Sequence, residues 1–223
     1  MHYKVGQLEI RSENAAKPAS QASSALVDWI RRMDSVSAAL DYGCGKLRYS
    51  GYLAAKCRRL TLVDCKIQVD RTQKIGGKDT TVRNYARKRW PHCRVLSVEE
   101  FEGEQAKVDF ILCANVLSTI PLENVRSQVL TKLSQSLTKQ GRCLFVAQYQ
   151  NSYFKKIATS KRAVRHLDGW ILKTPKGNFY YGILRREILS ALATAHGFQI
   201  IEAWIDGQSA YVLAGRANVQ PER

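Results

Sequence analysis

The chain has 223 residues, of which 45% are hydrophobic, and its 35 Lys and Arg against 19 Asp and Glu give a formal net charge of +16. A chain of this size can bury one sizeable core, so we predict a single domain over residues 1–223, without repeats or linkers. No apolar run approaches the roughly 18 residues of a membrane span, and residues 1–33 lack the order of a secretory signal. We therefore expect a cytoplasmic protein without a membrane partner.

The first 33 residues precede the first strand-like run. They contain the stretch NAAKPAS at residues 14–20, followed by a helix-like run at residues 25–33. Lys17-Pro18 is typical of a turn that leads into a helix.

The next segment, residues 39–64, has the layout of a nucleoside-binding unit. An apolar run leads into Asp41-Tyr42-Gly43-Cys44-Gly45, a helix-compatible stretch follows, and a second apolar run ends on Asp64. A sharp turn beside a ligand requires positive φ and no Cβ, which Gly43 and Gly45 provide. Asp64 lies 19 residues after Gly45, near the spacing of about 20 that places a carboxylate on ribose hydroxyls.

Two departures argue against a nicotinamide cofactor. Arg48 stands where G-x-G-x-x-G requires its third glycine, and Asp41 precedes the first glycine. A carboxylate disfavours an anionic pyrophosphate but suits a zwitterionic or cationic ligand such as S-adenosylmethionine. Short glycine motifs also recur in ordinary α/β turns, so that alternative stays open at this point.

Residues 41–64 resemble the first two motifs of class I S-adenosylmethionine-dependent methyltransferases, whose first motif reads D/E-x-G-x-G-x-G; Leu47 replaces the last glycine. The resemblance covers about residues 20–216. It implies a Rossmann-like, doubly wound α/β fold of three αβα layers, with a mostly parallel seven-strand sheet and a C-terminal antiparallel hairpin. It also implies S-adenosylmethionine as the cofactor.

The rest of the chain has the expected alternation of strands and helices. We predict strands at residues 94–98, 108–114, 143–147, 198–204 and 210–214, and helices at residues 122–137 and 184–196. Gly141 is expected to stop the first of these helices and Gly197 the second.

The resemblance also implies cofactor contacts. Asp41, Gly43, Cys44 and Gly45 would surround the methionine end, and Asp64 would bind the ribose diol. The family position for an adenine contact falls on the pair Glu99-Glu100, of which we favour Glu100; the alternative is an exposed acidic pair. Asn115 matches the position that closes the methionine pocket, or it begins a helix, or does both. In this family the leading segment often folds over the cofactor, as residues 1–33 could do here.

Six cysteines occur without a C-x-x-C pair, and four histidines are scattered. Neither set has the spacing of a metal site, so we expect reduced thiols and no metal.

The excess positive charge lies in two segments. Residues 56–94 hold twelve Lys and Arg against three Asp, residues 151–186 hold nine against one, and the remaining residues sum to −1. We interpret residues 65–92 and 151–182 as basic insertions that begin where strands end, beside the cofactor. They predict a nucleic-acid surface of cations and aromatic rings. The candidates are Arg83, Arg87, Arg89, Trp90, Tyr153, Lys155, Lys156 and Tyr181. Alternatively, residues 82–90 form a helix that simply shows its charges to water.

No acceptor motif identifies the methylated atom. Asn115, Tyr149 and His166 are the candidates for a catalytic role, His166 with Asp168 as an acid-base pair or as a solvated loop residue. Tyr149, Asn151 and Tyr153 are expected near the acceptor pocket, as candidates for stacking and hydrogen bonding. We predict a methyltransferase for RNA or DNA. A methyltransferase for a small metabolite or an acidic protein is one alternative, and an inactive binding subunit of the same fold, with a protein partner, is another. The oligomeric state stays open.

Overall fold

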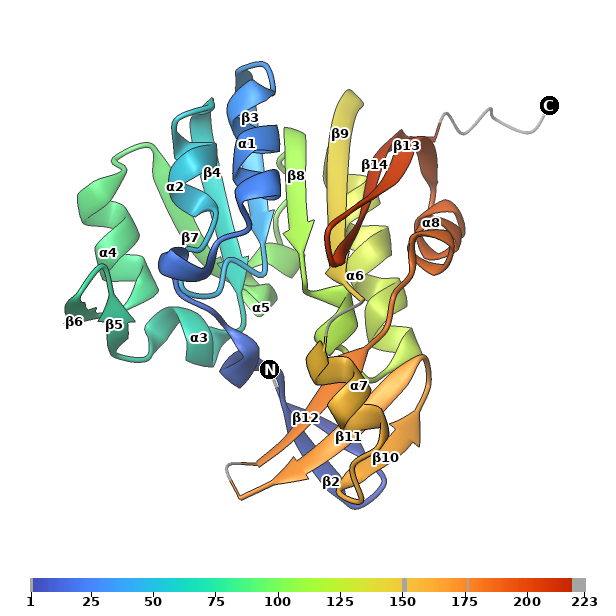
Figure 1. Ribbon diagram of the computed structural model, residues 1–223. Helices are drawn as coiled ribbons and strands as arrows, with labels where there is room; N and C mark the ends of the chain where they lie inside the picture. Colours follow the sequence, from blue (N-terminus) through green and yellow to red (C-terminus); the bar gives the residue numbers. More distant parts are fainter. Residues whose placement is uncertain (1, 150–151, 176, 218–223) are drawn as a thin grey trace.

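The computed structural model describes residues 2–149, 152–175 and 177–217. A seven-stranded sheet in the order β13-β14-β9-β8-β3-β4-β7 forms its centre (Figure 1). Strands β7, β4, β3, β8 and β9 are parallel, and β14 pairs antiparallel with both β9 and β13. The strands are β3 (Val36–Tyr42), β4 (Cys57–Asp64), β7 (Cys93–Ser97), β8 (Val108–Ala114), β9 (Leu137–Gln148), β13 (Phe198–Asp206) and β14 (Ser209–Arg216). The predicted sheet with its terminal hairpin is confirmed.

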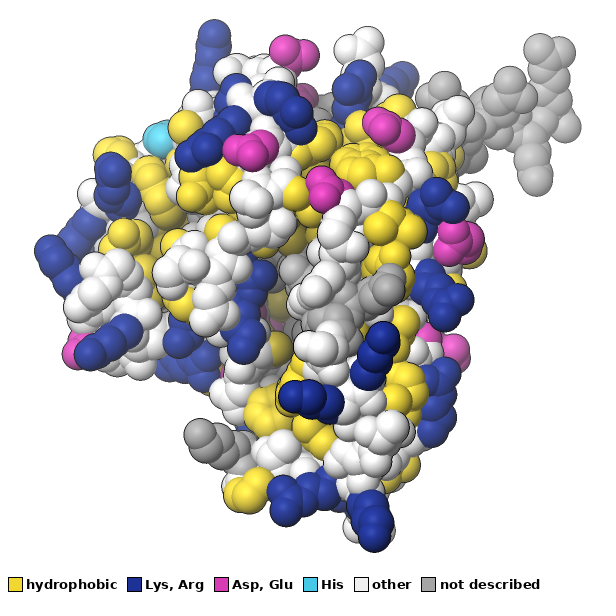
Figure 2. Space-filling model, in the orientation of Figure 1, with side chains coloured by type: hydrophobic (Ala, Val, Ile, Leu, Met, Phe, Trp, Pro, Cys, Tyr) yellow, Lys and Arg dark blue, Asp and Glu magenta, His cyan; other side chains and the backbone are white. Residues whose placement is uncertain are grey.

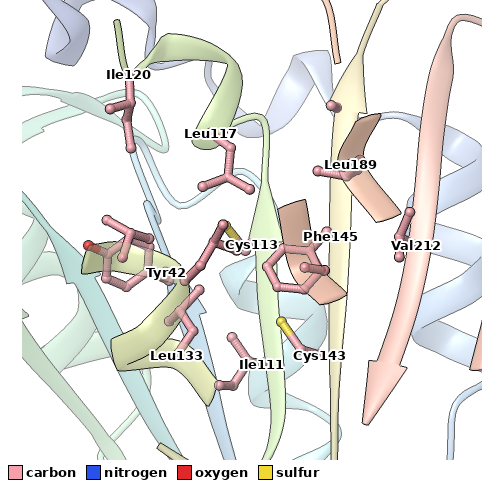
Figure 3. Packing of buried hydrophobic residues seen from close by; sticks show 14 of the residues in the cluster. Tyr42, Ile111, Cys113, Leu117, Ile120, Leu133, Cys143, Phe145, Leu189 and Val212 are labelled. Carbon is pink, nitrogen blue, oxygen red and sulfur yellow. The ribbon is translucent and has the colours of Figure 1, made fainter. Parts of the chain in front are cut away.

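Helices cover both faces of this sheet, as the three-layer prediction requires. One apolar cluster joins the sheet to α1 (Ser24–Arg32), α2 (Ser50–Ala54), α3 (Lys66–Asp70) and α4 (Val82–Arg89). The other joins it to α5 (Val98–Glu102), α6 (Glu123–Ser136) and α8 (Arg186–Thr194). Figure 3 shows Ile111 and Cys113 of β8 beside Phe145 and Cys143 of β9, with Leu133 of α6 in the same cluster. Parallel strands buried on both faces are continuously apolar, as β8 is from Phe110 to Ala114.

Gly141 has a different role from the predicted helix stop. Helix α6 ends at Ser136, strand β9 begins at Leu137, and Gly141 lies buried within that strand. A Cβ on Gly141 would lie 3.0 Å from side-chain atoms of Leu137 and Thr138 and from the Val108 carbonyl oxygen. The glycine therefore permits close approach of β9 to β8, which its position after a helical pattern does not reveal.

A second sheet, in the order β1-β2-β12-β11-β10, lies beyond the carboxyl ends of the central strands (Figure 1). Its members are β1 (His2–Val5), β2 (Leu8–Arg11), β10 (Ala163–His166), β11 (Gly169–Thr174) and β12 (Gly177–Gly182). Thus the N-terminal segment and the insertion at residues 151–182 meet in one five-stranded sheet, where β2 pairs in parallel with β12. Short helices flank it: η1 (Ser12–Ala15), η3 (Leu117–Thr119) and α7 (Ser152–Ala158). A further short helix, η2 (Ala19–Gln21), follows η1 along the chain.

The insertion at residues 65–92 packs on the central sheet near its β7 edge. It comprises α3, a hairpin of β5 (Gln73–Ile75) and β6 (Lys78–Thr80), and α4. Thr81 begins α4, because its hydroxyl accepts the backbone N–H of Asn84 at 3.0 Å.

Three further observations concern the described part of the chain. None of its helices is long and apolar enough to cross a membrane. No disulfide joins its six cysteines. It contains no group of three or more His, Cys, Asp and Glu side chains that could hold a metal ion.

Candidate functional site

A cavity of about 120 Å³ lies at the carboxyl ends of β3, β4 and β8. We call its side formed by residues 41–45, 48–49 and 64–65 the inner wall, and its side formed by Tyr3, Ser12, Glu13, Ala15, Ala16 and Lys17 the outer wall. The remaining lining residues are Val98, Ala114, Asn115, Val116, Thr119, Ile120 and Val129. Crevices outside the carboxyl ends of strands are where open α/β sheets bind ligands.

The glycine loop of the inner wall has the conformation that the sequence predicts. Gly43 and Gly45 have φ angles of +77° and +55°. A Cβ on Gly43 would lie 2.2 Å from Cγ2 of Val116, so only glycine fits without displacement. Leu47, which replaces the third glycine of the family pattern, has a φ of +62°. The left-handed turn is therefore kept, although Leu47 is a residue that rarely adopts it.

Asp64 closes this loop. Its Oδ2 accepts the backbone N–H of Gly45 and its Oδ1 that of Cys65, both at 2.8 Å. Burial raises the pKa of the Asp64 carboxyl, although the two N–H donors oppose that shift. The 19-residue spacing read in the sequence thus corresponds to a direct contact, and the carboxylate lines the cavity where a ribose diol is expected.

Asp41 is the second acid of the inner wall and is only 3% exposed. Burial raises its pKa to about 7, the nearby Asp64 adds to this shift, and a hydrogen bond from Ser50 Oγ at 2.6 Å opposes it. A buried and a partly buried carboxyl group in one cavity favour a ligand that brings positive charge. The amino and sulfonium groups of S-adenosylmethionine fit that requirement. No motif in the sequence pointed to Ser50.

Asn115 lines the cavity just after β8, with a φ of +60°. Its N–H donates to the Val146 carbonyl at 2.7 Å, and its Oδ1 accepts the N–H of Gln148 at 2.9 Å. Val116 precedes η3 and Leu122 precedes α6, so the alternative role of Asn115 as a helix cap is wrong. Its side chain instead joins the ends of β8 and β9.

Glu100 does not line the cavity, so the structure does not support the predicted adenine contact. Its Oε2 accepts the N–H of Ser97 at 2.6 Å and pairs with Arg83 at 2.7 Å, while the Ser97 hydroxyl accepts the N–H of Glu100. These bonds form a capping box at the start of α5. Val98, two positions earlier, lines the cavity instead.

The outer wall passes over the glycine loop. Pro18 bridges to Lys46, and Ala16 lies against Gly45, where an added Cβ would be 3.3 Å from Cβ of Ala16. From the insertion, Nη2 of Arg71 donates to the Glu13 carbonyl at 3.1 Å. No motif in the sequence pointed to Ser12 or Glu13 at this cavity.

The candidates in the first insertion divide into two groups. Arg83 is tied internally, because it pairs with Asp70 and Glu100 at 2.7 Å each. Trp90 packs beside Gly51 and against the Tyr85 ring, with ring centroids 6.1 Å apart. Arg83 and Trp90 therefore stabilise the fold rather than form an open binding surface. Three neighbouring cations of α4 are exposed, namely Arg87, Lys88 and Arg89.

In the second insertion, Tyr153 is 47% exposed and makes an edge contact with Tyr181, with ring centroids 5.6 Å apart. Burial raises the pKa of Tyr181. Lys155 and Lys156 are exposed on α7. These four candidates share one region of the surface.

The proposed acid-base pair of His166 and Asp168 is wrong. His166 Nε2 lies 2.7 Å from the Pro121 carbonyl oxygen, to which it can only donate. Asp168 binds Arg126 and Tyr180 instead. The N–H of Tyr149 donates to Gln208, and Tyr149 does not line the cavity. Asn151, also considered near the acceptor, lies outside the described residues.

Comparisons with known proteins agree with this geometry. Residues 40–145 match a methyltransferase domain family. The uncharacterized protein YmfD of Escherichia coli (strain K12) is 36% identical over 218 residues, which cover 98% of this chain and 97% of YmfD.

Two solved structures share the fold. N-methyltransferase NodS from Bradyrhizobium japonicum WM9, in complex with S-adenosyl-L-homocysteine, is 15% identical, with a TM-score of 0.59 over 89% of this chain and 85% of NodS. The 1,6-didemethyltoxoflavin-N1-methyltransferase of Burkholderia thailandensis, with its acceptor and S-adenosylhomocysteine bound, is 14% identical, with a TM-score of 0.58 over 93% of this chain and 79% of that chain.

Proposed function

The chain belongs to the class I S-adenosylmethionine-dependent methyltransferases, with YmfD as a full-length relative, and we propose that its methyl acceptor is a nucleic acid. The acceptor would be held by the two basic insertions, residues 65–92 and 151–182. Both begin at carboxyl ends of central strands, the edge that carries the cofactor cavity.

The observation that carries this proposal is a set of exposed cations without a carboxylate partner. Within the described residues, no ion pair involves Lys74, Lys78, Arg87, Lys88, Arg89, Lys155, Lys156, Lys161, Arg162 or Lys173. Figure 2 shows dark blue side chains on the side of α4 and the β5–β6 hairpin and again over the five-stranded sheet. Cations that no neighbouring carboxylate neutralises are available for phosphates, which dominate nucleic-acid affinity.

Aromatic side chains accompany these cations. Tyr153 is exposed beside Lys155 and Lys156, and the Arg165 guanidinium lies 4.7 Å from the Trp170 ring centroid. Single strands bind to surfaces that combine cations with aromatic platforms. We therefore favour a single-stranded segment as the form that reaches the cavity.

S-adenosylmethionine, when bound, supplies a methyl group that its sulfonium activates. The chain's own residues would bind and orient the cofactor and the acceptor. Asp64 would accept from the ribose diol, Asp41 would hold a negative charge near the cationic end, and Gly43 would leave space for close approach. Asn115 is held by β9 at the cavity edge, where an acceptor would meet the methyl group. Alignment of the reacting groups in this enclosed space is the main catalytic contribution we assign to the protein.

The test is transfer of a labelled methyl group by the purified chain to RNA, single-stranded DNA and duplex DNA. We expect the triple variant R87A/K88A/R89A to raise KM for the nucleic acid at least about tenfold, since each lost phosphate contact weakens binding. The kcat should change little. The matched control R32A/R58A/R59A removes the same charge from exposed positions, two of them at the start of β4, away from the cavity. Equal effects of the two variants, or no labelled nucleic acid, would reject the proposal.

A small-molecule acceptor is the second candidate, because the outer wall passes over the glycine loop and lines part of the cavity. The toxoflavin methyltransferase, which shares the fold, binds such an acceptor. Labelling in a nuclease-treated extract distinguishes the candidates: persistent labelled metabolites support the small acceptor, and loss of label supports nucleic acid.

A further inference from the structure

We propose that Arg126, Asp168 and Tyr180 are positioning residues that hold the outer wall of the cofactor cavity in place. None of the three lines the cavity. They lie between helix α6 and the five-stranded sheet that carries the outer wall. This role does not depend on which acceptor the enzyme methylates.

The three side chains form one buried polar cluster. Arg126 is 4% exposed, and its Nη2 lies 2.8 Å from Asp168 Oδ1 and 3.0 Å from the Tyr180 hydroxyl oxygen. The Tyr180 hydroxyl donates to the same Asp168 oxygen at 2.6 Å. A buried guanidinium requires such partners, and their directions define where it can sit. The cluster therefore sets the position of β12, which carries Tyr180, relative to α6.

The first connection to the cavity is direct. Nε of Arg126 donates to the Ile120 carbonyl at 2.8 Å, and Ile120 lines the cavity. His166 of the same five-stranded sheet binds the next carbonyl, that of Pro121, at 2.7 Å. Two consecutive carbonyls beside the cavity are thus held by the cluster and by the sheet it anchors.

The second connection runs through the sheet. Asn178 of β12 pairs with Ile10 of β2, and its Nδ2 donates to the Glu9 carbonyl at 3.0 Å. Strand β2 continues without a break into η1, whose Ser12 and Glu13 belong to the outer wall. A displacement of β12 would therefore be passed to the segment that covers the glycine loop.

The end of β12 shows how tightly this junction is packed. A Cβ on Gly182 would lie 3.1 Å from Arg126 Nη2, from Asp168 Oδ2 and from the Ser118 carbonyl oxygen. Ser118 belongs to η3, the helix that also supplies Thr119 to the cavity. The end of β12 therefore lies directly beside both the cluster and the η3 edge of the cavity.

The first test is Tyr180→Phe, which keeps the ring and removes the hydroxyl. We expect the calorimetric Kd for S-adenosylhomocysteine and the KM for S-adenosylmethionine to rise about tenfold, as for a lost hydrogen bond to a charged group. The kcat at saturating cofactor should change much less. Leu189→Ala, a buried change on α8 away from the cavity, is the control: it should lower stability but leave the Kd unchanged.

The second test separates positioning from stability. Replacing a buried ion pair by apolar residues often preserves stability. The triple variant R126M/D168L/Y180F leaves no buried polar side chain of the cluster unpaired. It should therefore unfold at a denaturant concentration near that of the parent, yet keep a raised Kd, because the directed bonds are gone. The proposal is wrong if Tyr180→Phe binds S-adenosylhomocysteine as the parent does, or if the triple variant recovers stability and affinity together.

Discussion

The inner wall of the cofactor cavity comes from a short stretch of chain, residues 41–65, whereas the outer wall depends on contacts such as that of Asn178 with Glu9, 169 positions apart. In the inner wall, one strand-loop-helix-strand unit places the glycines and both acids. In the outer wall, the N-terminal strands and the second insertion must first pair. Affinity for the ligand can therefore depend on residues that do not touch it. Substitutions in the two walls should therefore differ in how strongly they change the affinity for the ligand.

The largest expected effect concerns Asp41 and the pH dependence of stability. Burial raises its pKa from 3.8 to about 7, so the folded, ligand-free protein keeps this proton where the unfolded chain has released it. The associated stability is present at low pH and is lost as pH rises through about 7, by about 4 kcal/mol in total. Asp41→Asn should therefore gain stability relative to the parent between pH 4 and pH 8. Urea unfolding at both pH values measures this, and a constant difference would contradict it.

The same carboxyl predicts how affinity depends on pH. A cationic ligand favours the ionised form, so binding of S-adenosylmethionine by the parent should strengthen from pH 6 to pH 8 and then level off. In Asp41→Asn the affinity should be weak and should lack this component of the pH dependence. Titration calorimetry at three pH values is the measurement.

Gly43→Ala tests the close approach of the glycine loop to Val116. The new Cβ would meet Val116 at 2.2 Å with the backbone at a φ of +77°. We expect a loss of about 3 kcal/mol in the free energy of unfolding, from overpacking and from the left-handed conformation together. In a Val116→Ala background the same change should cost only about 1–2 kcal/mol, because the conformational cost remains. Equal costs in both backgrounds would show that the contact is unimportant.

Asp64→Asn tests the ribose contact. The amide keeps the size of the side chain but loses the charge, so affinity for S-adenosylhomocysteine should fall about 100-fold, near 2.7 kcal/mol. Asp79→Asn, an exposed acid of β6, is the control and should bind as the parent does. Similar calorimetric Kd values for Asp64→Asn and the parent would remove Asp64 from the site.

The smallest expected effect belongs to the outer wall. Asn178→Ala removes one exposed hydrogen bond between β12 and β2, which should weaken S-adenosylhomocysteine binding about threefold. Asn84→Ala, exposed on α4, should have no effect. If Asn178→Ala instead matched Asp64→Asn, the two walls would not differ in the way the structure indicates.

Much of the central sheet follows from local patterns. The apolar run at residues 108–114 coincides with β8, and the strand-like runs around residues 41 and 60 coincide with the ends of β3 and the core of β4. Gly141 shows the limit, since a glycine after a helical pattern is read as a stop, although here it serves the packing of β9 on β8. The residues on either side of a glycine do not reveal how closely a neighbouring strand approaches it.

Charge shows the same limit. Composition predicted that the insertions are basic, but Arg83 is paired with Asp70 and Glu100, 13 and 17 positions away, whereas Arg87 is exposed four positions later. Glu100 matched a family position by alignment of motifs alone, and the fold directs it to Ser97 and Arg83. Which charged side chains have an ion-pair partner depends on distances within the fold, and the spacing of residues along the sequence does not reveal these distances.

The sequence alone was sufficient to predict the family and the central sheet and to indicate the residues of the inner wall. The reason is that the glycine loop and the acid after the second strand lie within one continuous unit whose spacing reflects its geometry. The outer wall and its Arg126–Asp168–Tyr180 cluster depend instead on contacts that exist only in the folded chain. Strand pairing between residues 10 and 178 leaves no periodic pattern in either segment. A buried polar cluster likewise exists only once three distant side chains share a space from which water is excluded.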